Sequence, residues 1–371
     1  MKQETFLKVA AIVTAATVGD GVFALPFVFY KAGWLLGLCY LAILGAMVVL
    51  AHTVYYETLQ KTGEKERLLG LARKYLGEGG FWTGFVAIVF GLLLTLVAYL
   101  ILGTQFIRLG FPSAPPQEPL FFFWAFVAVT MLLNDKHVIE LELTGIIFTS
   151  LVIILIFVTA WPNVVFNGVS AVNPVNFFVP FGAILFSLAG WTAIEPAYES
   201  EKSRGNRSAK RMWIALAAGT SFAALLYVMF AAGILGTAGT ITPDTISGLA
   251  NWPIWKRDVT AVLGLLAVWT VSMPISREIR NSLERDLGWS KFASRATIVF
   301  APLVLVLLGL TNFLVVVGLV GGLFLSTQYL LIVSVGRRAL TLSATRKFFL
   351  DLVAVIFIVA AIYSVWIFVV H

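Results

Sequence analysis

The sequence predicts an all-α polytopic membrane protein, built from two inverted repeats of five spans with an eleventh span added. Three observations predict this fold class: the composition, the lengths of the uncharged apolar runs, and an interruption that recurs in two of them. Of the 371 residues, 60% are hydrophobic and only 12% are charged, whereas a soluble domain is nearer a quarter charged. Apolar runs of about 20 residues recur along the chain, and each can cross the ~30 Å hydrocarbon core of a bilayer.

The apolar runs and the charged segments between them predict eleven spans in one domain. The first run is too long for a cleavable signal peptide and lacks a small-residue cleavage site. The single cysteine, Cys39, lies within a span, so no disulfide or cysteine metal site is predicted. The predicted spans are 5–31, 34–59, 81–106, 119–134, 138–160, 178–199, 210–236, 259–276, 292–309, 311–336 and 348–369.

The basic residues predict the orientation of these spans. With the N-terminus in the cytoplasm, most of the 26 Lys and Arg residues fall on the cytoplasmic side, as the positive-inside rule requires. We therefore expect a multi-pass protein of the cell membrane with its C-terminus outside, whose surroundings are the lipid bilayer. The net charge of +7 follows from this topology and does not indicate nucleic-acid binding. No obligatory protein partner is evident.

Two short stretches within the apolar runs align without a gap. GDGVFALP, residues 19–26, matches AGWTAIEP, residues 189–196, in its small residues and its final proline. The same offset of 170 residues carries the third, fourth and fifth spans close to the eighth, ninth and tenth. Because five is odd, the second repeat would run upside down relative to the first. The predicted division is a first repeat at 1–160, a second at 171–336 and the added span at 348–369.

The matching stretches predict interrupted helices at residues 19–21 and 189–191. Such interruptions leave backbone N–H and C=O groups without helical partners near the bilayer midplane. Interrupted spans at corresponding positions of two repeats indicate the binding site of a secondary transporter. Half-helix ends suit the ammonium and carboxylate groups of a zwitterionic amino acid. The candidate substrate-binding residues are Ala16, Val18, Gly19, Asp20, Gly21, Phe186, Ser187, Ala189, Gly190 and Trp191.

Several stretches resemble a known group of proteins. VGDGVFALPFVFYKAGWLLGL is similar to the first-span signature of the amino acid/auxin permease and aromatic amino acid permease families. LARKYLGEGG, FSLAGWTAIEP and LLYVMFAAGILGTAGTIT are also similar. The resemblance implies the LeuT-type fold and transport of a neutral or aromatic amino acid, driven by a cation gradient. In these relatives the position of Asp20 is usually small and uncharged.

Asp20 has both a structural and a functional interpretation. A carboxylate in the middle of a span costs roughly 2.5–3.5 kcal/mol. We expect it to cap the outer half-helix, accepting a hydrogen bond from the N–H of Val22 or Phe23, and also to face a central cavity. There it could bind a substrate amine, a cation or a proton. A cationic amino acid or amine is therefore an alternative substrate.

The coupling ion is either a proton or sodium, and no resident cofactor or metal is predicted. The resemblance implies adjacent hydroxyls on the eighth span for sodium, but Thr270 and Ser272 lie about 200° apart around a helix. The titratable Asp20 and Glu195 favour a proton, although the fifth span lacks the lysine that proton-coupled relatives often supply. We expect Glu195 to pair with an arginine on the cytoplasmic side. Thr17 completes the candidate ion-coupling residues.

Two further stretches have expected roles. Residues 68–76 carry an apolar stripe between charges, which predicts an amphipathic helix on the inner membrane face or under the bundle. Residues 237–255 form an outer stretch with few charges, which is a candidate gate or a passive loop.

Other classes of protein fit less well. An intramembrane aspartyl protease needs two carboxylates that share a proton, and no second aspartate lies at midplane depth. The sequence has no HExxH, P-loop or nucleophile-elbow motif, so an enzyme is not predicted. A sensor of the same fold that binds an amino acid without transporting it remains an alternative.

Overall fold

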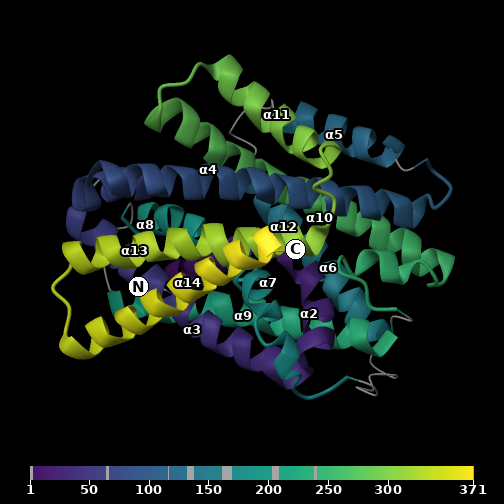
Figure 1. The fold of residues 1–371 in the computed structure, drawn as a ribbon, viewed down its shortest axis with the longest axis horizontal. Coiled ribbons are helices and arrows are strands. Elements are labelled where there is room, and N and C mark those ends of the chain that lie inside the picture. The colour runs from purple at the N-terminus through teal and green to yellow at the C-terminus, as the bar shows by residue number, and fades with distance from the viewer. Residues whose placement is uncertain are drawn as a thin grey trace.

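The computed structural model describes residues 3–63, 67–115, 117–131, 138–160, 169–202, 209–237 and 240–370. Within these ranges all regular structure is helical. Most helices run along the long axis of the molecule, as Figure 1 shows. The first part of the chain contains α1 (Gln3–Thr17), η1 (Asp20–Ala24), α2 (Leu25–Ala32), α3 (Trp34–Thr62), α4 (Leu68–Gly110), α5 (Gln117–Met131) and α6 (Val138–Ala160).

The second part of the chain repeats the pattern of one short, interrupted helix followed by longer ones. Its elements are η4 (Pro174–Asn176), α7 (Val179–Ser187), η5 (Trp191–Ala193), α8 (Ile194–Lys202), α9 (Ala209–Thr237), η6 (Ile246–Leu249), α10 (Ile254–Asn281), the π-turn η7 (Ser282–Asp286), α11 (Lys291–Leu307), α12 (Phe313–Leu319), the π-turn η8 (Val320–Leu325), α13 (Ser326–Ala339) and α14 (Ala344–Val370).

Within the described residues, each predicted span coincides with one helix or with a run of two or three consecutive helical elements. The predicted span 138–160 has the same bounds as α6, whereas α10 starts five residues before the predicted 259. Within the described ranges, seven helices are long and apolar enough to cross a membrane, or eight if one bent pair counts as a span. This count leaves out α5, α11 and α6, the last of which was compared with the requirement only over Ile147–Ala160, so the total of eleven spans stays a prediction.

The predicted amphipathic helix is the first part of α4. Gly77 adopts a left-handed conformation (φ 78°) and bends the chain there, a conformation that glycine reaches without steric cost. Before the bend, the side chains of Leu68, Leu71 and Ala72 are buried. This segment therefore packs under the bundle, which is one of the two placements that the stripe predicted.

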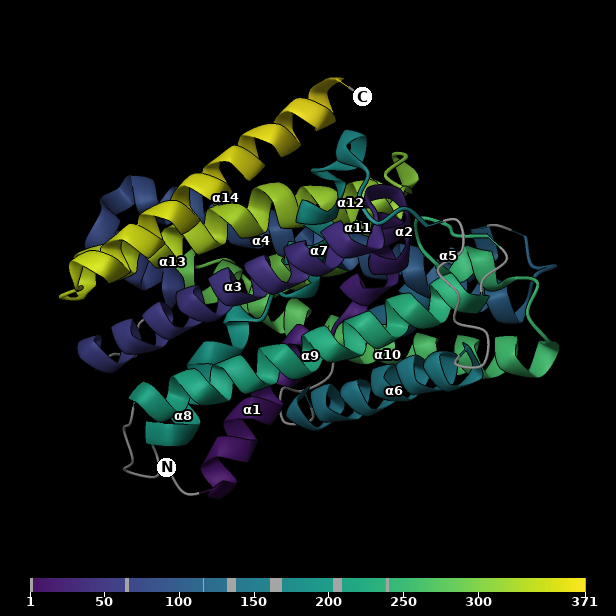
Figure 2. The ribbon, with the colours of Figure 1, turned by 90° about the horizontal axis from the view of Figure 1, so that it is seen from below.

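The remainder of α4 forms the centre of the bundle. It packs between α13 on one side and α11 and α5 on the other, and also contacts α10 (Figure 1). In contrast, α14 lies on the outside, opposite α6 and α9 (Figure 2). Its exposed side chains are large and apolar, including Phe348, Leu352, Val355, Ile362 and Trp366. Such a surface suits the hydrocarbon of a bilayer, since soluble proteins rarely expose large apolar patches.

Basic residues predicted to be cytoplasmic gather at one end of the bundle. Lys61 Nζ at the end of α3 donates to the Ala339 carbonyl of α13 (2.5 Å), and Arg338 Nη1 donates to the Tyr75 carbonyl of α4 (2.5 Å). Arg346 of α14 pairs with Glu57 of α3 at 2.6 Å. These contacts bring together two predicted inner segments, the one between α3 and the long part of α4 and the one between α13 and α14, as the positive-inside pattern requires. Which side of the membrane this end faces stays a prediction.

Candidate functional site

The first interruption (residues 18–19) separates α1 from η1 and α2. Gly19 has an extended backbone (φ −122°, ψ −168°), and the segments Phe6–Thr17 and Asp20–Ala32 meet at an angle of 48°. Pro26 lies in the first turn of α2, where its missing N–H removes no helical hydrogen bond. The predicted break in the first span is therefore present, one residue before its predicted start.

The second interruption (residues 188–190) separates α7 from η5 and α8 in the same way. The half-helix α7 ends at Ser187, and Gly190 precedes η5 with φ −148° and ψ 15°. Thr17 and Ser187, the last residues of α1 and α7, correspond under the offset of 170 residues. The two interruptions thus occupy equivalent places, which agrees with the predicted repeat.

A single tyrosine joins the two interruptions. The Tyr227 hydroxyl of α9 shares its hydrogen between the Ser187 carbonyl, 2.5 Å away, and the Thr17 carbonyl. The last carbonyl groups of a helix have no intrahelical partner. Tyr227 therefore supplies hydrogen bonding to the ends of both half-helices at once.

The glycines bring the two interruptions into direct contact. A Cβ added at Gly21 would lie 2.6 Å from Ser187 Oγ and 2.7 Å from Ser187 Cα. A Cβ at Gly190 would lie 2.6 Å from Thr17 Oγ1, whereas one at Gly19 would meet no atom closer than 4.0 Å. None of the three has a positive φ, so other residues could adopt these backbone conformations. At Gly21 and Gly190 a side chain would collide with the neighbouring interruption, so glycine is needed there for its small size and not for its backbone conformation.

The predicted capping role of Asp20 is wrong. Its side chain is 1% exposed, and neither carboxylate oxygen has a hydrogen-bond partner among the residues that the structure describes. Asp20 is already the first residue of η1, and Gly19 occupies the preceding cap position. An N-cap side chain accepts from the position before the helix, so the geometry for capping is missing. Burial also means that Asp20 faces no open cavity in this conformation.

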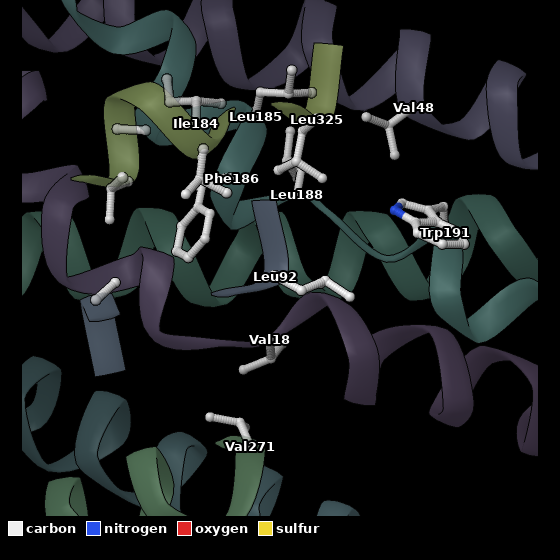
Figure 3. Packing of buried hydrophobic residues seen from close by; sticks show 14 of the residues in the cluster. Val18, Val48, Leu92, Ile184, Leu185, Phe186, Leu188, Trp191, Val271 and Leu325 are labelled. Atoms are coloured by element: carbon white, nitrogen blue, oxygen red, sulfur yellow. The ribbon is translucent and has the colours of Figure 1, made fainter. Parts of the chain in front are cut away.

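Apolar side chains surround the two interruptions. Figure 3 shows the buried side chains around the two interruptions, which include Val18, Phe186, Leu188, Leu92 of α4 and Val271 of α10. Beside η1, the Phe23 ring meets the rings of Phe106 and Phe230 edge-on, at centroid distances of 5.2 and 5.3 Å. Of the other predicted binding residues, Ala16 and Ala189 are partly buried at the edges of the same core. The surroundings of the two interruptions are therefore apolar and partly aromatic.

The second interruption is also tied to α4 and α13 by polar side chains. Trp191 Nε1 donates to Gln328 Oε1 (2.6 Å), and Gln328 Nε2 donates to the Ala87 carbonyl (2.8 Å). His52 of α3 and Tyr329 of α13 form a neighbouring pair. The sequence reasoning missed Tyr227, Gln328, Tyr329 and His52. The signal that could have found them is a polar side chain inside an apolar run, which is costly in a membrane and therefore informative.

Glu195 belongs to an ionic cluster at the basic end of the bundle. Arg67 Nε lies 3.0 Å from Glu195 Oε2, and Arg67 also pairs with Glu278 of α10. Tyr55 donates to Glu195 Oε1 at 2.5 Å. The predicted pairing of Glu195 with an arginine is confirmed. Burial alone would lower the pKa of Arg67, but the two carboxylates outweigh it and raise that pKa, so this guanidinium stays charged.

The candidate sodium ligands are engaged differently from one another. Thr270 Oγ1 donates to its own helix at Leu266 and Ala267 (3.0 and 2.9 Å), and Ser272 Oγ donates to Trp269 (2.6 Å). Thr17 Oγ1 is buried without a partner in the described part of the chain. The hydroxyls on α10 thus satisfy their hydrogen bonds locally, and the choice between ions stays open.

The outer stretch that the sequence left as a candidate gate or a passive loop packs onto the first interruption. Thr245 Oγ1 donates to the Phe23 carbonyl of η1 at 2.5 Å, and Ile246 and Leu249 of η6 are fully buried. This loop therefore covers the part of the chain that carries Asp20, as a gate would.

An all-helical bundle with two interrupted spans that meet in its core is the architecture of LeuT-fold transporters. MhsT, solved in complex with L-phenylalanine, has a TM-score of 0.66 at 14% identity over 99% of this chain and 98% of that one. The Eremococcus coleocola manganese transporter has a TM-score of 0.67 at 11% identity, over 97% and 86% of the two chains. MHP1, a nucleobase-cation-symport-1 family transporter, has a TM-score of 0.56 at 14% identity, over 87% and 76%. These similarities confirm the predicted fold class.

The chain belongs to the tryptophan/tyrosine permease family, whose model matches residues 2–251. The comparison with curated proteins gave no match. Membership confirms the resemblance to aromatic amino acid permeases that the first span indicated. The protein is a multi-pass membrane transporter of the amino acid permease class.

Proposed function

We propose that this protein is a proton-coupled secondary transporter that moves an aromatic amino acid across the cell membrane. The observation that carries the proposal is the meeting of two interrupted helices inside an apolar, partly aromatic core. Family membership supports the substrate class, as does the phenylalanine bound by a protein of similar fold, MhsT. Since proteins of this fold also include a manganese transporter, fold alone does not choose the cargo.

The chemistry of the two interruptions suits an aromatic amino acid. The C-terminal carbonyl groups of α1 and α7 favour the substrate's ammonium group, and the carboxylate of Asp20 adds a negative charge nearby. Phe23, Phe186 and Trp191 offer apolar and aromatic surface for the side chain. The alternative is a cationic amino acid or an amine, which the unpartnered Asp20 carboxylate would favour.

Alternating access follows from the contacts on either side of the interruptions. The loop around Thr245 closes the side of η1, and the cluster of Arg67, Glu195 and Glu278 ties α8 to α10 at the basic end. Transport requires each side to open in turn around a fixed site. We place the Arg67 cluster and the N-terminus in the cytoplasm, with the C-terminus outside.

Proton coupling is favoured by the different environments of the candidate groups. Glu195 is held by Arg67 and Tyr55, so it contributes to closure. Asp20 has no such partner in the described part of the chain, which leaves it free to exchange a proton or an ion for a substrate ammonium group. Sodium, with Thr17, Thr270 and Ser272 as ligands, is the alternative.

The test is uptake into proteoliposomes. We expect labelled tryptophan, tyrosine or phenylalanine to accumulate under an imposed pH gradient in sodium-free buffer, and an ionophore that collapses the gradient to abolish accumulation. A strict sodium requirement would overturn proton coupling. Competition by cationic amines but not by tryptophan would support the alternative substrate. Binding without accumulation would identify a sensor instead.

A further inference from the structure

His52 is a buried histidine with one nitrogen unpartnered. It lies on α3 with 0% of its side chain exposed. Its Nε2 is 3.1 Å from the Tyr329 hydroxyl, and its Nδ1 has no hydrogen-bond partner among the described residues. Leaving a buried polar atom unsatisfied costs about 1–3 kcal/mol, so such an atom in a native structure needs an explanation.

His52 lies against the second interruption. A Cβ at Gly190 would be 3.6 Å from His52 Cε1, the ring carbon between the two nitrogens, and 2.6 Å from Thr17 Oγ1. The backbone of Gly190 also interacts with the Tyr329 hydroxyl. His52 therefore faces the point where the last residue of α1 meets the second interruption. Any rearrangement of that interruption changes what the imidazole contacts.

Two carboxylates of α8, which packs against the helix of His52, are already engaged. On α8, Glu195 is bound by Arg67 and Tyr55, and Glu201 accepts from Tyr56. Other titratable side chains on α3 and on the elements around it include Cys39, Tyr40, Glu57 and Lys61 of α3, Tyr30 and Lys31 of α2, Tyr198 and Glu199 of α8, Tyr227 of α9, Tyr329, Arg337 and Arg338 of α13, and Asp20 of η1. Within the described residues, none of the carboxylates forms an ion pair with His52.

We propose that His52 is a proton-binding site whose charged form is compensated by the carboxylate of the bound amino acid. In the tautomer whose Nε2–H donates to the Tyr329 hydroxyl, the lone pair on Nδ1 accepts a proton to give an imidazolium. A buried charge without a partner is strongly disfavoured, so the empty transporter holds His52 neutral. A substrate carboxylate at the second interruption supplies the counter-charge. Proton and substrate then cross together, and the empty protein returns uncharged at this residue. This inference rests on the proton coupling proposed above.

A spectroscopic test observes His52 directly. The sequence has three histidines, and the other two, His137 and His371, lie outside the described residues. A protein carrying His137→Gln and His371→Gln keeps His52 as its single imidazole, and we expect it to transport like the wild type. With ¹⁵N-labelled histidine in nanodiscs, we expect neutral-ring signals without substrate and imidazolium signals with saturating tryptophan at the same pH. A ring that stays neutral with tryptophan across about pH 5–8, the range in which histidine ordinarily titrates, would overturn the proposal.

Transport by His52→Gln provides the second readout. Glutamine keeps a polar group toward Tyr329 but cannot carry the proton. We expect accumulation driven by a pH gradient to fall at least tenfold, while exchange of tryptophan against internal tryptophan persists. Unchanged accumulation would overturn the role of His52. If the wild type itself fails to accumulate tryptophan in a pH gradient, the proposed coupling fails instead, so the two failures are distinguishable.

Discussion

The two interruptions have the same backbone plan but different chemistry. In each, a half-helix ends, two or three residues leave the helix, and a short 3-10 turn leads into the next half-helix. The second interruption is tied to its surroundings by Trp191, Gln328 and Tyr329. The first carries buried polar atoms without partners in the described chain, on Thr17 and Asp20.

This difference suggests a division of tasks. Satisfied polar networks rigidify the segments that they join, so the second interruption is the better-held framework. The first interruption depends more on close packing and leaves a carboxylate available. An inverted repeat therefore fixes where the chain breaks, while individual side chains decide what each break does.

The largest expected effect comes from Gly21→Ala. The added methyl group would meet the backbone of Ser187 at 2.7 Å and the Phe186 ring at 2.8 Å, and backbone cannot move aside as a flexible side chain can. Overpacking of this kind costs about 1–3 kcal/mol. We expect a lower thermal unfolding midpoint and loss of tryptophan uptake.

Gly19→Ala is the matched control for Gly21→Ala, because its methyl group would meet no atom closer than 4.0 Å. We expect uptake and thermal midpoint close to the wild type. Equal losses in both variants would show that contact between the interruptions is not what these glycines provide.

The second-largest effect on tryptophan uptake is expected for Asp20→Asn. The substitution removes a buried charge that has no hydrogen-bond partner in the described chain, so we expect a higher thermal midpoint, since burying an unpaired charge is costly. Accumulation of tryptophan should nevertheless fall at least tenfold. The control is Asp258→Asn, whose side chain is 51% exposed and should leave both quantities unchanged. Wild-type accumulation by Asp20→Asn at every pH would leave Asp20 without a transport role.

A smaller effect is expected for Trp191→Phe at the second interruption. The ring is largely retained, but Gln328 Oε1 loses its donor inside the protein, which costs about 1–3 kcal/mol. Chemical or thermal denaturation in detergent would measure the loss. Trp269→Phe provides the comparison, because Trp269 donates to Thr130 at a half-buried position and should cost less. A larger loss at Trp269 would contradict the assigned role of the Gln328 contact.

The smallest effect on stability is expected for Tyr227→Phe, which removes one hydrogen-bond donor shared by both interruptions. The lost hydroxyl leaves the carbonyl groups of Thr17 and Ser187 without this donor, and a typical hydrogen bond contributes about 0.5–1.5 kcal/mol. Hydrogen exchange should accelerate at the ends of both α1 and α7. Tyr30→Phe, at a residue 42% exposed, should change neither. Faster exchange at only one end would show that Tyr227 serves a single interruption.

The sequence by itself determined the helices and the places where two of them break. The span 138–160 and the structure's α6 have the same bounds, and both interruptions begin within one residue of their predicted starts. These features depend on local properties, namely the length of an apolar run, the charges that end it, and small residues with a following proline. Local properties are read directly from neighbouring residues.

Only the tertiary structure decided which side chains meet. The sequence predicted that Glu195 pairs with an arginine. It did not predict that this arginine is Arg67, 128 residues away. The capping expected of Asp20 is wrong because the helix begins one residue earlier than that role requires. A polar residue inside an apolar run marks His52 in the sequence, but nothing in the sequence places it against Gly190. In a bilayer the hydrocarbon is as apolar as the helices, so shape complementarity and hydrogen bonds between distant segments set their packing. Those contacts exist only once the helices are assembled.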